Sequence, residues 1–134
     1  MTLEDLEETL PNGLHDAQIR SMKHDFESGT VKLQVRLLFG VPDDPPETRH
    51  SYRDAEVVFY RVLFFASEIP KPESAFRSPR RIWFQVYPME PGVLSEQLLK
   101  TLPADTQCYS LFVNDWYCSI HIAAGDVSFS WDVS

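Results

Sequence analysis

The chain has 134 residues, of which 43% are hydrophobic and 13% aromatic, and its formal charge is −8 at pH 7. This length and composition predict one packed globular domain over 1–134 and exclude a disordered tail. The acidic balance argues against a nucleic acid or an anionic membrane as a partner, and it favours a protein partner with a basic surface.

The N-terminal part of the chain predicts a short helix followed by a β-hairpin. Thr2 is a suitable N-cap for the helix, and the apolar side of this helix is formed by Leu3, Leu6 and Leu10. Ser28-Gly29 marks the tip of the hairpin. Its return strand points alternate apolar residues inward: Val31, Leu33, Val35, Leu37 and Phe39. In the outgoing strand Ile19 and Met22 have opposite parity, which predicts a β-bulge near Arg20-Ser21.

The middle of the chain predicts two more strands and a second helix. Ala55 to Phe65 is apolar on both faces, which is typical of an interior strand, and Arg61 interrupts it at a bend. Arg81 to Tyr87 alternates and predicts a further strand. The spacing of four leucines then predicts a short amphipathic helix over 94–102.

Two turns predict a three-stranded meander in the last third of the chain. Asn114-Asp115 and Gly125-Asp126 suit two-residue hairpin turns, because these residues tolerate positive φ. Pairing outward from both turns places six pairs on one apolar face. These pairs are Val113–Trp116, Leu111–Cys118, Tyr109–Ile120, Ile122–Phe129, Ile120–Trp131 and Cys118–Val133.

The predicted elements add up to a mainly β or α+β fold. It contains about seven antiparallel strands, with an N-terminal hairpin and a C-terminal three-strand meander, together with two short helices. We expect all of them to belong to the single domain 1–134.

The sequence also predicts a cytoplasmic location. No stretch approaches the ~20 consecutive apolar residues of a transmembrane helix. Four of the first eight residues are acidic, whereas a signal peptide begins with basic residues. Cys108 and Cys118 are expected on opposite faces of one hairpin, where they cannot form a disulfide. Free thiols in a chain without a leader are typical of the cytoplasm.

Leu14-His15-Asp16-Ala17 is the most distinctive local string. A histidine beside an aspartate can act as a general base or a metal ligand. The alternative is structural: the His15 ring packs at the rim of the core, and Asp16 accepts backbone N–H bonds at the strand entry. The dipeptide lacks metal-ligand spacing, and His24 lies about 30 Å away along an extended strand. The sequence therefore predicts a structural role and no metal site.

Trp83 and Tyr87 form a second candidate site. They lie on the opposite face of the 81–87 strand from Phe84 and Val86, so they are expected to face outward. Exposed aromatic side chains on a strand are typical of protein-binding surfaces. The alternative is that the helix 94–102 folds back and covers them with its leucines.

His121 is expected to face outward, on the same side as Ser110 and beside Ser119 and Ser130, with Cys108 diagonally near. This resembles a nucleophile and a base, but no strained nucleophile turn or glycine-rich oxyanion loop accompanies it, so a solvated sheet face is favoured. The sequence has no phosphate loop, dinucleotide fingerprint or paired-cysteine zinc spacing, and no cofactor is expected.

Three strings carry a resemblance to known proteins: Leu14-His15-Asp16-Ala17, Asn114-Asp115-Trp116 and Ser128-Phe129-Ser130-Trp131. They resemble a group of small bacterial proteins, some of which are similar to immunity proteins, the intracellular antidotes of polymorphic toxin systems. The resemblance spans most of the chain and implies non-enzymatic binding of a partner. It transfers no catalytic residue, and His15 and Asp16 are the residues that match its recurring motif.

The leading hypothesis is a non-catalytic cytosolic domain that binds a protein partner through His15, Asp16, Trp83 and Tyr87. The first alternative is a β-domain that holds a small ligand in an interior cavity near His15. The second alternative is a hydrolase that uses His121 and neighbouring serines. The sequence specifies no oligomeric state.

Overall fold

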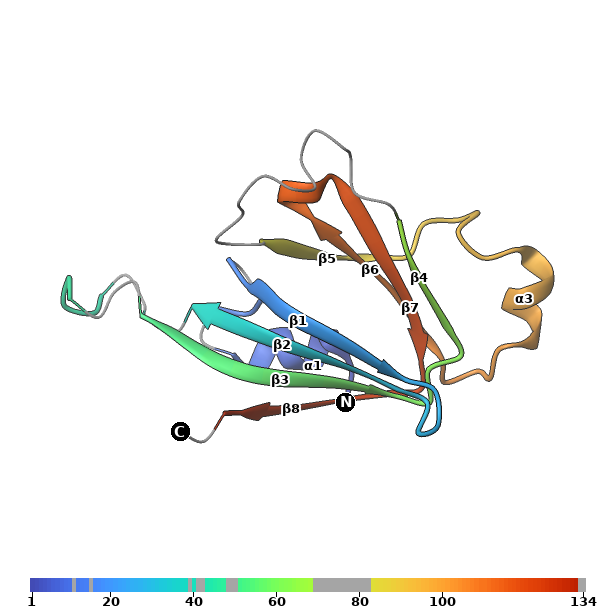
Figure 1. Cartoon of the computed structure of the whole chain (residues 1–134), viewed down its shortest axis with the longest axis horizontal. Coiled ribbons are helices and arrows are strands. Elements are labelled where there is room, and N and C mark those ends of the chain that lie inside the picture. The colour runs from blue at the N-terminus through green and yellow to red at the C-terminus, as the bar shows by residue number, and fades with distance from the viewer. Residues whose placement is uncertain are drawn as a thin grey trace.

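The computed structural model describes residues 1–10, 12–14, 16–38, 40, 43–47, 51–68 and 83–132. These residues form eight strands in two antiparallel sheets, with two short α-helices (Figure 1). The mainly-β prediction is confirmed, with one strand more than expected.

Each sheet has four strands. Sheet 1 has the order β1-β2-β3-β8 and consists of β1 (Gln18–Asp25), β2 (Thr30–Leu38), β3 (Tyr52–Tyr60) and β8 (Asp126–Trp131). Sheet 2 has the order β4-β7-β6-β5 and consists of β4 (Phe64–Ser67), β7 (Cys118–Ala124), β6 (Gln107–Val113) and β5 (Phe84–Pro88).

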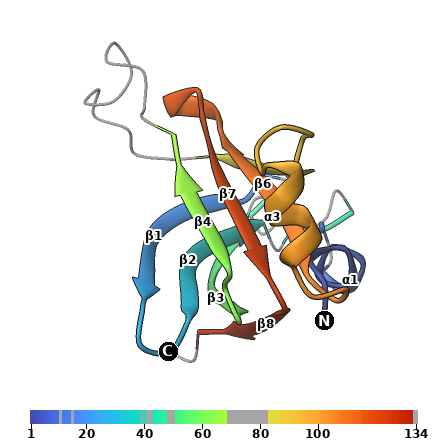
Figure 2. The same ribbon diagram turned by 90° about the vertical axis from the view of Figure 1, so that its right-hand side faces the viewer.

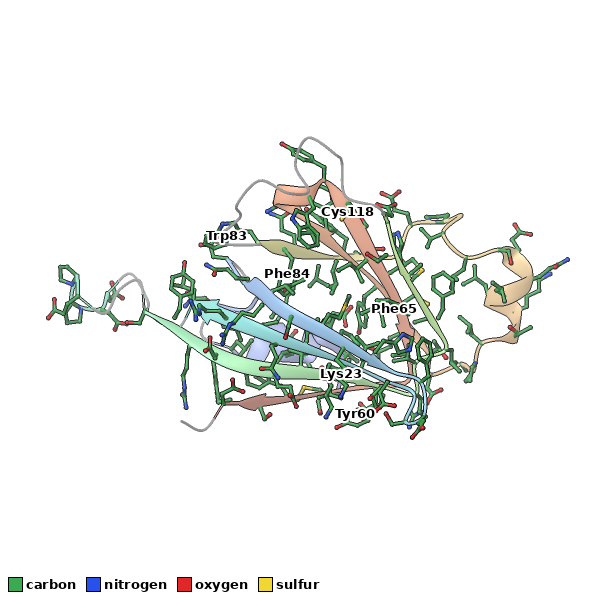
Figure 3. All side chains as sticks on the ribbon, in the orientation of Figure 1. Lys23, Tyr60, Phe65, Trp83, Phe84 and Cys118 are labelled. Atoms are coloured by element: carbon green, nitrogen blue, oxygen red, sulfur yellow. The ribbon has the colours of Figure 1, made fainter. Side chains whose placement is uncertain are left out.

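The two sheets enclose a common hydrophobic core. In Figure 1 one sheet lies above the other, and they meet on the right, where β3 leads into β4. Side chains from both sheets fill the space between them (Figure 3), including buried Phe84 from β5 and Phe59 from β3. A bridge between Gln18, the first residue of β1, and Trp83, which directly precedes β5, joins the two sheets.

Helix α1 (Leu3–Thr9) belongs to this core. Thr2 caps it as predicted: its side chain accepts the backbone N–H of Asp5, and the Asp5 carboxylate accepts the N–H of Thr2. The N-terminal segment connects the two sheets, because the backbone N–H of Leu3 donates to the Tyr109 hydroxyl of β6 and Met1 O accepts the N–H of Val127 in β8. Figure 2 shows α1 beside β6 and β8.

The N-terminal hairpin also follows its prediction. The inward residues of β2 are buried: Val31, Leu33, Val35 and Leu37. Phe39 lies outside the described residues. The register shifts between Ile19, which pairs with Val35, and Ser21, which pairs with Gln34. Arg20 is thus the extra residue of a β-bulge, and the parity of the outgoing strand changes there.

The predicted interior strand from Ala55 to Phe65 is divided between the two sheets. It breaks at Arg61, whose φ of 51° lies in the left-handed region. Its guanidinium donates to the carbonyl of Gly125 at 3.0 Å, and the N–H of Gly125 donates to the carbonyl of Tyr60 at 3.0 Å. A Cβ at Gly125 would collide with the Arg61 side chain. The chain therefore crosses from one sheet to the other twice at this corner, once between β3 and β4 and once between β7 and β8.

Because the chain crosses between the sheets at this corner, the predicted pairing of the last two strands of the meander is wrong. Gly125-Asp126 is not a hairpin turn, because β8 leaves sheet 2 and pairs with β3 in sheet 1. Trp131 pairs with Ala55 instead of Ile120. Its half-buried ring contacts Phe129 edge to face at 4.9 Å and lies 4.7 Å from the Arg53 guanidinium. The predicted partner Val133 lies outside the described residues.

The other half of the meander forms with a different register. Asn114–Trp116 is a short 3-10 helix followed by Tyr117 at φ 48°, so the connection is longer than the predicted two residues. The pairs are Val113–Cys118, Leu111–Ile120 and Tyr109–Ile122. The shift from the predicted register is two residues, and an even shift leaves every side chain on its predicted face.

The two cysteines are both free, and they lie on opposite faces of sheet 2 as predicted. Burial raises the pKa of both thiols, and the carboxylate of Glu68 also raises the pKa of Cys118. Because the thiolate is the reactive form, neither residue is poised as a nucleophile.

We expect iodoacetamide to modify half-buried Cys108 slowly in the native protein, and buried Cys118 only after unfolding in urea. Peptide mass spectrometry would locate the label, and Cys108→Ser should abolish native labelling. Equal native labelling of both residues, or a disulfide between them under non-reducing conditions, would contradict the assignment of the faces.

Candidate functional site

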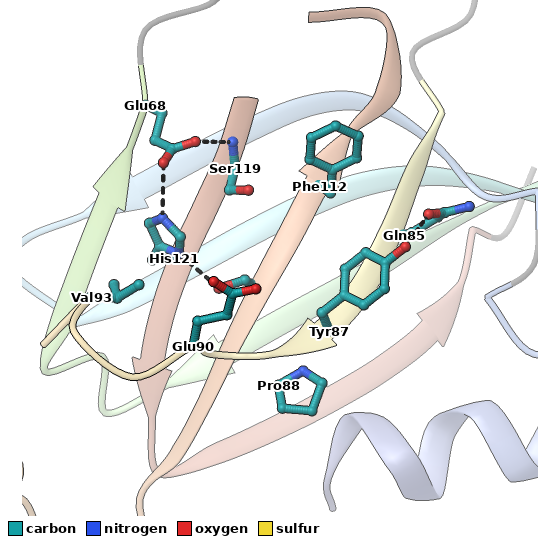
Figure 4. A pocket seen from close by; sticks show the side chains of 10 residues that line it. Glu68, Gln85, Tyr87, Pro88, Glu90, Val93, Phe112, Ser119 and His121 are labelled. Atoms are coloured by element: carbon teal, nitrogen blue, oxygen red, sulfur yellow. Dashed lines mark hydrogen bonds and ion pairs between the residues drawn. The ribbon is translucent and has the colours of Figure 1, made fainter. Parts of the chain in front are cut away.

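A pocket of about 450 Å³ lies on the face of sheet 2 that points away from the core (Figure 4). We call it the acidic aromatic pocket. Its walls come from the end of β4, from β5, β6 and β7, and from the segment between β5 and α3 (Glu96–Thr101). The lining residues are Glu68, Gln85, Tyr87, Pro88, Glu90, Val93, Ser110, Phe112, Ser119 and His121.

The strand register places three of these side chains in one row. Tyr87 of β5 pairs with Ser110 of β6, and Ser110 pairs with His121 of β7. Cross-strand partners lie on the same face of a sheet, so the row crosses the pocket from its edge to its floor.

His121 forms the floor of the pocket, and each of its ring nitrogens lies near a polar side chain. Its Nδ1 lies 2.7 Å from Oγ of Ser110, and its Nε2 lies 3.6 Å from Oε2 of Glu68. Only 9% of this residue is exposed. The predicted solvated position of His121 is therefore wrong, because Ser110 and Glu68 cover the ring.

Glu68 extends the ladder between β4 and β7. Its backbone N–H donates to the carbonyl of Ser119 at 3.0 Å, and its Oε1 accepts the N–H of Ser119 at 2.7 Å. The carboxylate therefore takes the place of a backbone acceptor at the edge of the sheet. This double contact fixes one negative charge at the pocket wall.

The charge and the aromatic rings of the pocket are arranged on different sides. Figure 4 shows Glu68 and Glu90 on the side of His121, and the rings of Tyr87 and Phe112 on the other side. Tyr87 is 48% exposed, and its hydroxyl donates to Oε1 of Gln85. None of the described lining residues is a lysine or an arginine. The pocket is therefore suited to a cationic group.

The structure also brings Asp16 and Trp83 together. They line a neighbouring hollow of about 170 Å³, together with Leu14, Phe84, Gln85 and Asn114. The N–H of Phe84 donates to the carbonyl of Ala17 at 3.1 Å, which places Ala17 beside the start of β5. His15 lies outside the described residues. Gln85 lines this hollow and the acidic aromatic pocket, so the two are adjacent.

The two aromatic candidates have different environments. Trp83 is half-buried, and its ring meets Tyr52 edge-on at 6.4 Å. Tyr87 is exposed, so the alternative in which the second helix covers both residues is wrong for Tyr87. The helix α3 itself presents Leu98 and Leu99 to solvent.

Sequence reasoning missed most of the pocket. Ser130, which was expected beside His121, lies in the other sheet, and Ser110 takes its place. The alternation of β6 and β7 did place Ser110 and His121 on the outward face. No sequence signal indicated that Glu68 or Glu90 would join them, because both lie in connecting segments.

Within the described residues, no group of three or more His, Cys, Asp or Glu side chains could hold a metal ion. The His24 ring contacts the rings of Phe26 and Phe65 in tilted arrangements, at 4.3 and 5.0 Å between ring centroids. His15 and His50 lie outside the described part, so the expectation that the protein binds no metal stays a prediction.

The described part of the chain contains no helix long and apolar enough to cross a bilayer. No protein-family model, curated protein or solved structure matches this chain.

Proposed function

We propose that this protein is a non-catalytic cytosolic domain that binds a protein partner with a basic surface. The acidic aromatic pocket is the observation that carries the proposal. It combines the carboxylates of Glu68 and Glu90 with the exposed ring of Tyr87. Tyrosine is enriched among residues that dominate binding energy at protein interfaces. The formal charge of −8 would also accelerate encounter with a basic partner.

The proposed interface extends from the pocket to the hollow beside it. That hollow adds Asp16 and Trp83, both of which are candidate binding residues from the sequence. An interface over both hollows would use β5 as its centre, since Gln85 lines both of them. Such a binding surface agrees with the non-enzymatic role that the resemblance to immunity proteins implies, and it needs no cofactor and no nucleic acid.

The test is affinity capture from the native organism, followed by titration of the purified partner in a calorimeter. We expect Tyr87→Ala to weaken binding by at least about 1 kcal/mol, as truncation of an interface tyrosine does. Rising salt should weaken the complex further, because exposed charges are screened. Phe26→Ala is the matched control, since it removes an exposed ring from the tip of the β1–β2 hairpin, which does not line the pocket. A partner with an acidic surface, or equal affinities for both variants, would contradict the proposal.

A second candidate function is hydrolysis, which is favoured by the contact of 2.7 Å between Ser110 Oγ and His121 Nδ1. In such a reaction Oγ would bond to an acyl carbon while Nδ1 takes the hydroxyl proton and returns it to the leaving group. Against this role, Ser110 is buried in the middle of β6, between β5 and β7. The strand ladders on both sides occupy the backbone amides that could stabilise an oxyanion.

A fluorophosphonate probe separates the two candidates. The binding domain should gain no covalent adduct, whereas a serine hydrolase would be labelled at Ser110 and would lose the label in Ser110→Ala. Stoichiometric labelling of the folded protein at Ser110 would favour hydrolysis over partner binding as the function.

A further inference from the structure

We propose that the acidic aromatic pocket receives the guanidinium group of one arginine side chain. The inference rests on the proposed function and names the group through which a basic partner is anchored. Three properties of the pocket support it: the charge, the size, and the separation of the carboxylates from the aromatic rings.

The charge of the pocket selects a cation. The described lining residues include two carboxylates, those of Glu68 and Glu90, and no lysine or arginine. An anion would be repelled by both carboxylates. A neutral ligand would remove water from the carboxylates without supplying a charge in return, which is unfavourable. A cation satisfies both carboxylates at once.

The arrangement of the walls favours a planar cation. A guanidinium has five N–H donors in one plane, so it can donate to carboxylates at its edge while its face lies on an aromatic ring. The pocket has these partners on separate sides, with Glu68 and Glu90 beside His121 and with Tyr87 and Phe112 opposite (Figure 4). An ammonium is more strongly hydrated and uses an aromatic face less readily.

The size of the pocket admits the whole side chain. Its volume of about 450 Å³ exceeds what a guanidinium group alone would fill. Pro88 and Val93 add apolar surface to the lining, which suits the three methylene groups of arginine. We therefore expect the stem to lie against these residues, with the charged end at the floor.

The floor is also fixed before a ligand arrives. Glu68 Oε1 accepts the N–H of Ser119, and the His121 ring is held between Ser110 and Glu68. A carboxylate that is already oriented loses little conformational entropy on binding. Glu68 would thus be the fixed acceptor, and exposed Glu90 would contact the ligand from the segment between β5 and α3.

The test uses three small probes in a titration followed by amide NMR spectra of the protein. N-acetyl-arginine amide should shift the amide signals of Phe112, Ser119 and His121 in a saturable way. N-acetyl-citrulline amide, its neutral isostere, should leave them unchanged. N-acetyl-lysine amide should bind more weakly than the arginine probe. A citrulline probe that binds equally well, or a lysine probe that binds more tightly, overturns the assignment.

Charge-removing variants locate the site. Glu68→Gln keeps an oxygen that can accept the Ser119 N–H, and Glu90→Gln alters an exposed side chain. Each variant should lower the affinity for the arginine probe about threefold. The double variant should lower it about tenfold if the effects add. Glu27→Gln is the matched control, because Glu27 is an exposed acid at the tip of the β1–β2 hairpin. Unchanged urea midpoints would show that the variants fold. Equal binding by the double variant and the control would refute the site.

This inference and the proposed function can fail separately. If the arginine probe does not bind, but a basic partner is captured and lost on changing Tyr87, the proposed function stands and the arginine anchor is wrong. If the probe binds at the pocket and the captured partner is acidic or indifferent to Tyr87, the anchor site stands and the proposed function is wrong.

Discussion

Replacing Phe59 by alanine is expected to lower the free energy of unfolding by about 3–5 kcal/mol. Phe59 is 0% exposed and lies in β3, at the centre of the core. Its ring centroid is 6.5 Å from that of Tyr109 in β6, so it fills space between the two sheets. Truncation would leave a cavity there as well as remove the transfer free energy of the ring.

The matched control is Phe26→Ala, which removes the same atoms from a ring that is 85% exposed. This variant should lower the free energy of unfolding by no more than about 0.5 kcal/mol. Urea unfolding followed by tryptophan fluorescence measures both values. Similar midpoints for the two variants would mean that the Phe59 ring does not lie between the sheets.

Leu6→Ala is expected to lower the free energy of unfolding by about 2–5 kcal/mol. Leu6 is 1% exposed and projects from α1 into the common core. The helix is short, so its stability depends on packing more than on helix propensity. We therefore expect the loss of this leucine to release α1 together with the contacts that the N-terminal segment makes to β6 and β8.

Leu99→Ala in α3 is the matched control, because Leu99 is also helical but is 47% exposed. Alanine is at least as good a helix former as leucine, so the free energy of unfolding of this variant should lie within about 0.5 kcal/mol of that of the parent protein. A larger loss from Leu99→Ala than from Leu6→Ala would contradict the finding that α1 packs in the core and that α3 lies outside it.

Features encoded by neighbouring residues could be predicted well. The Thr2 cap, the hairpin tip at Ser28-Gly29 and the bulge at Arg20 each depend on a few adjacent positions. The alternation of β2 gave the buried face without knowledge of its partner, because side chains alternate across a strand whatever it pairs with.

The pairing of strands could be predicted only in part. Alternation restricts the register to even shifts, and the observed shift of two residues between β6 and β7 satisfies that restriction. Turn propensity at Asn114 could not exclude a longer connection. At Gly125 the same residues suit either a hairpin or a corner, and the choice depends on the backbone and side chain of Arg61, which are remote in sequence.

The sequence by itself determined the short helices, the alternating faces and an outward position for Ser110, His121 and Tyr87. The tertiary structure alone decided that β8 crosses to the other sheet, that Glu68 and Glu90 line one pocket with His121, and that Asp16 and Trp83 line one hollow. The physical reason is the range of the interactions involved. Caps and alternation act over a few residues, whereas the pocket depends on strand order and on loops that are positioned only after both sheets have packed.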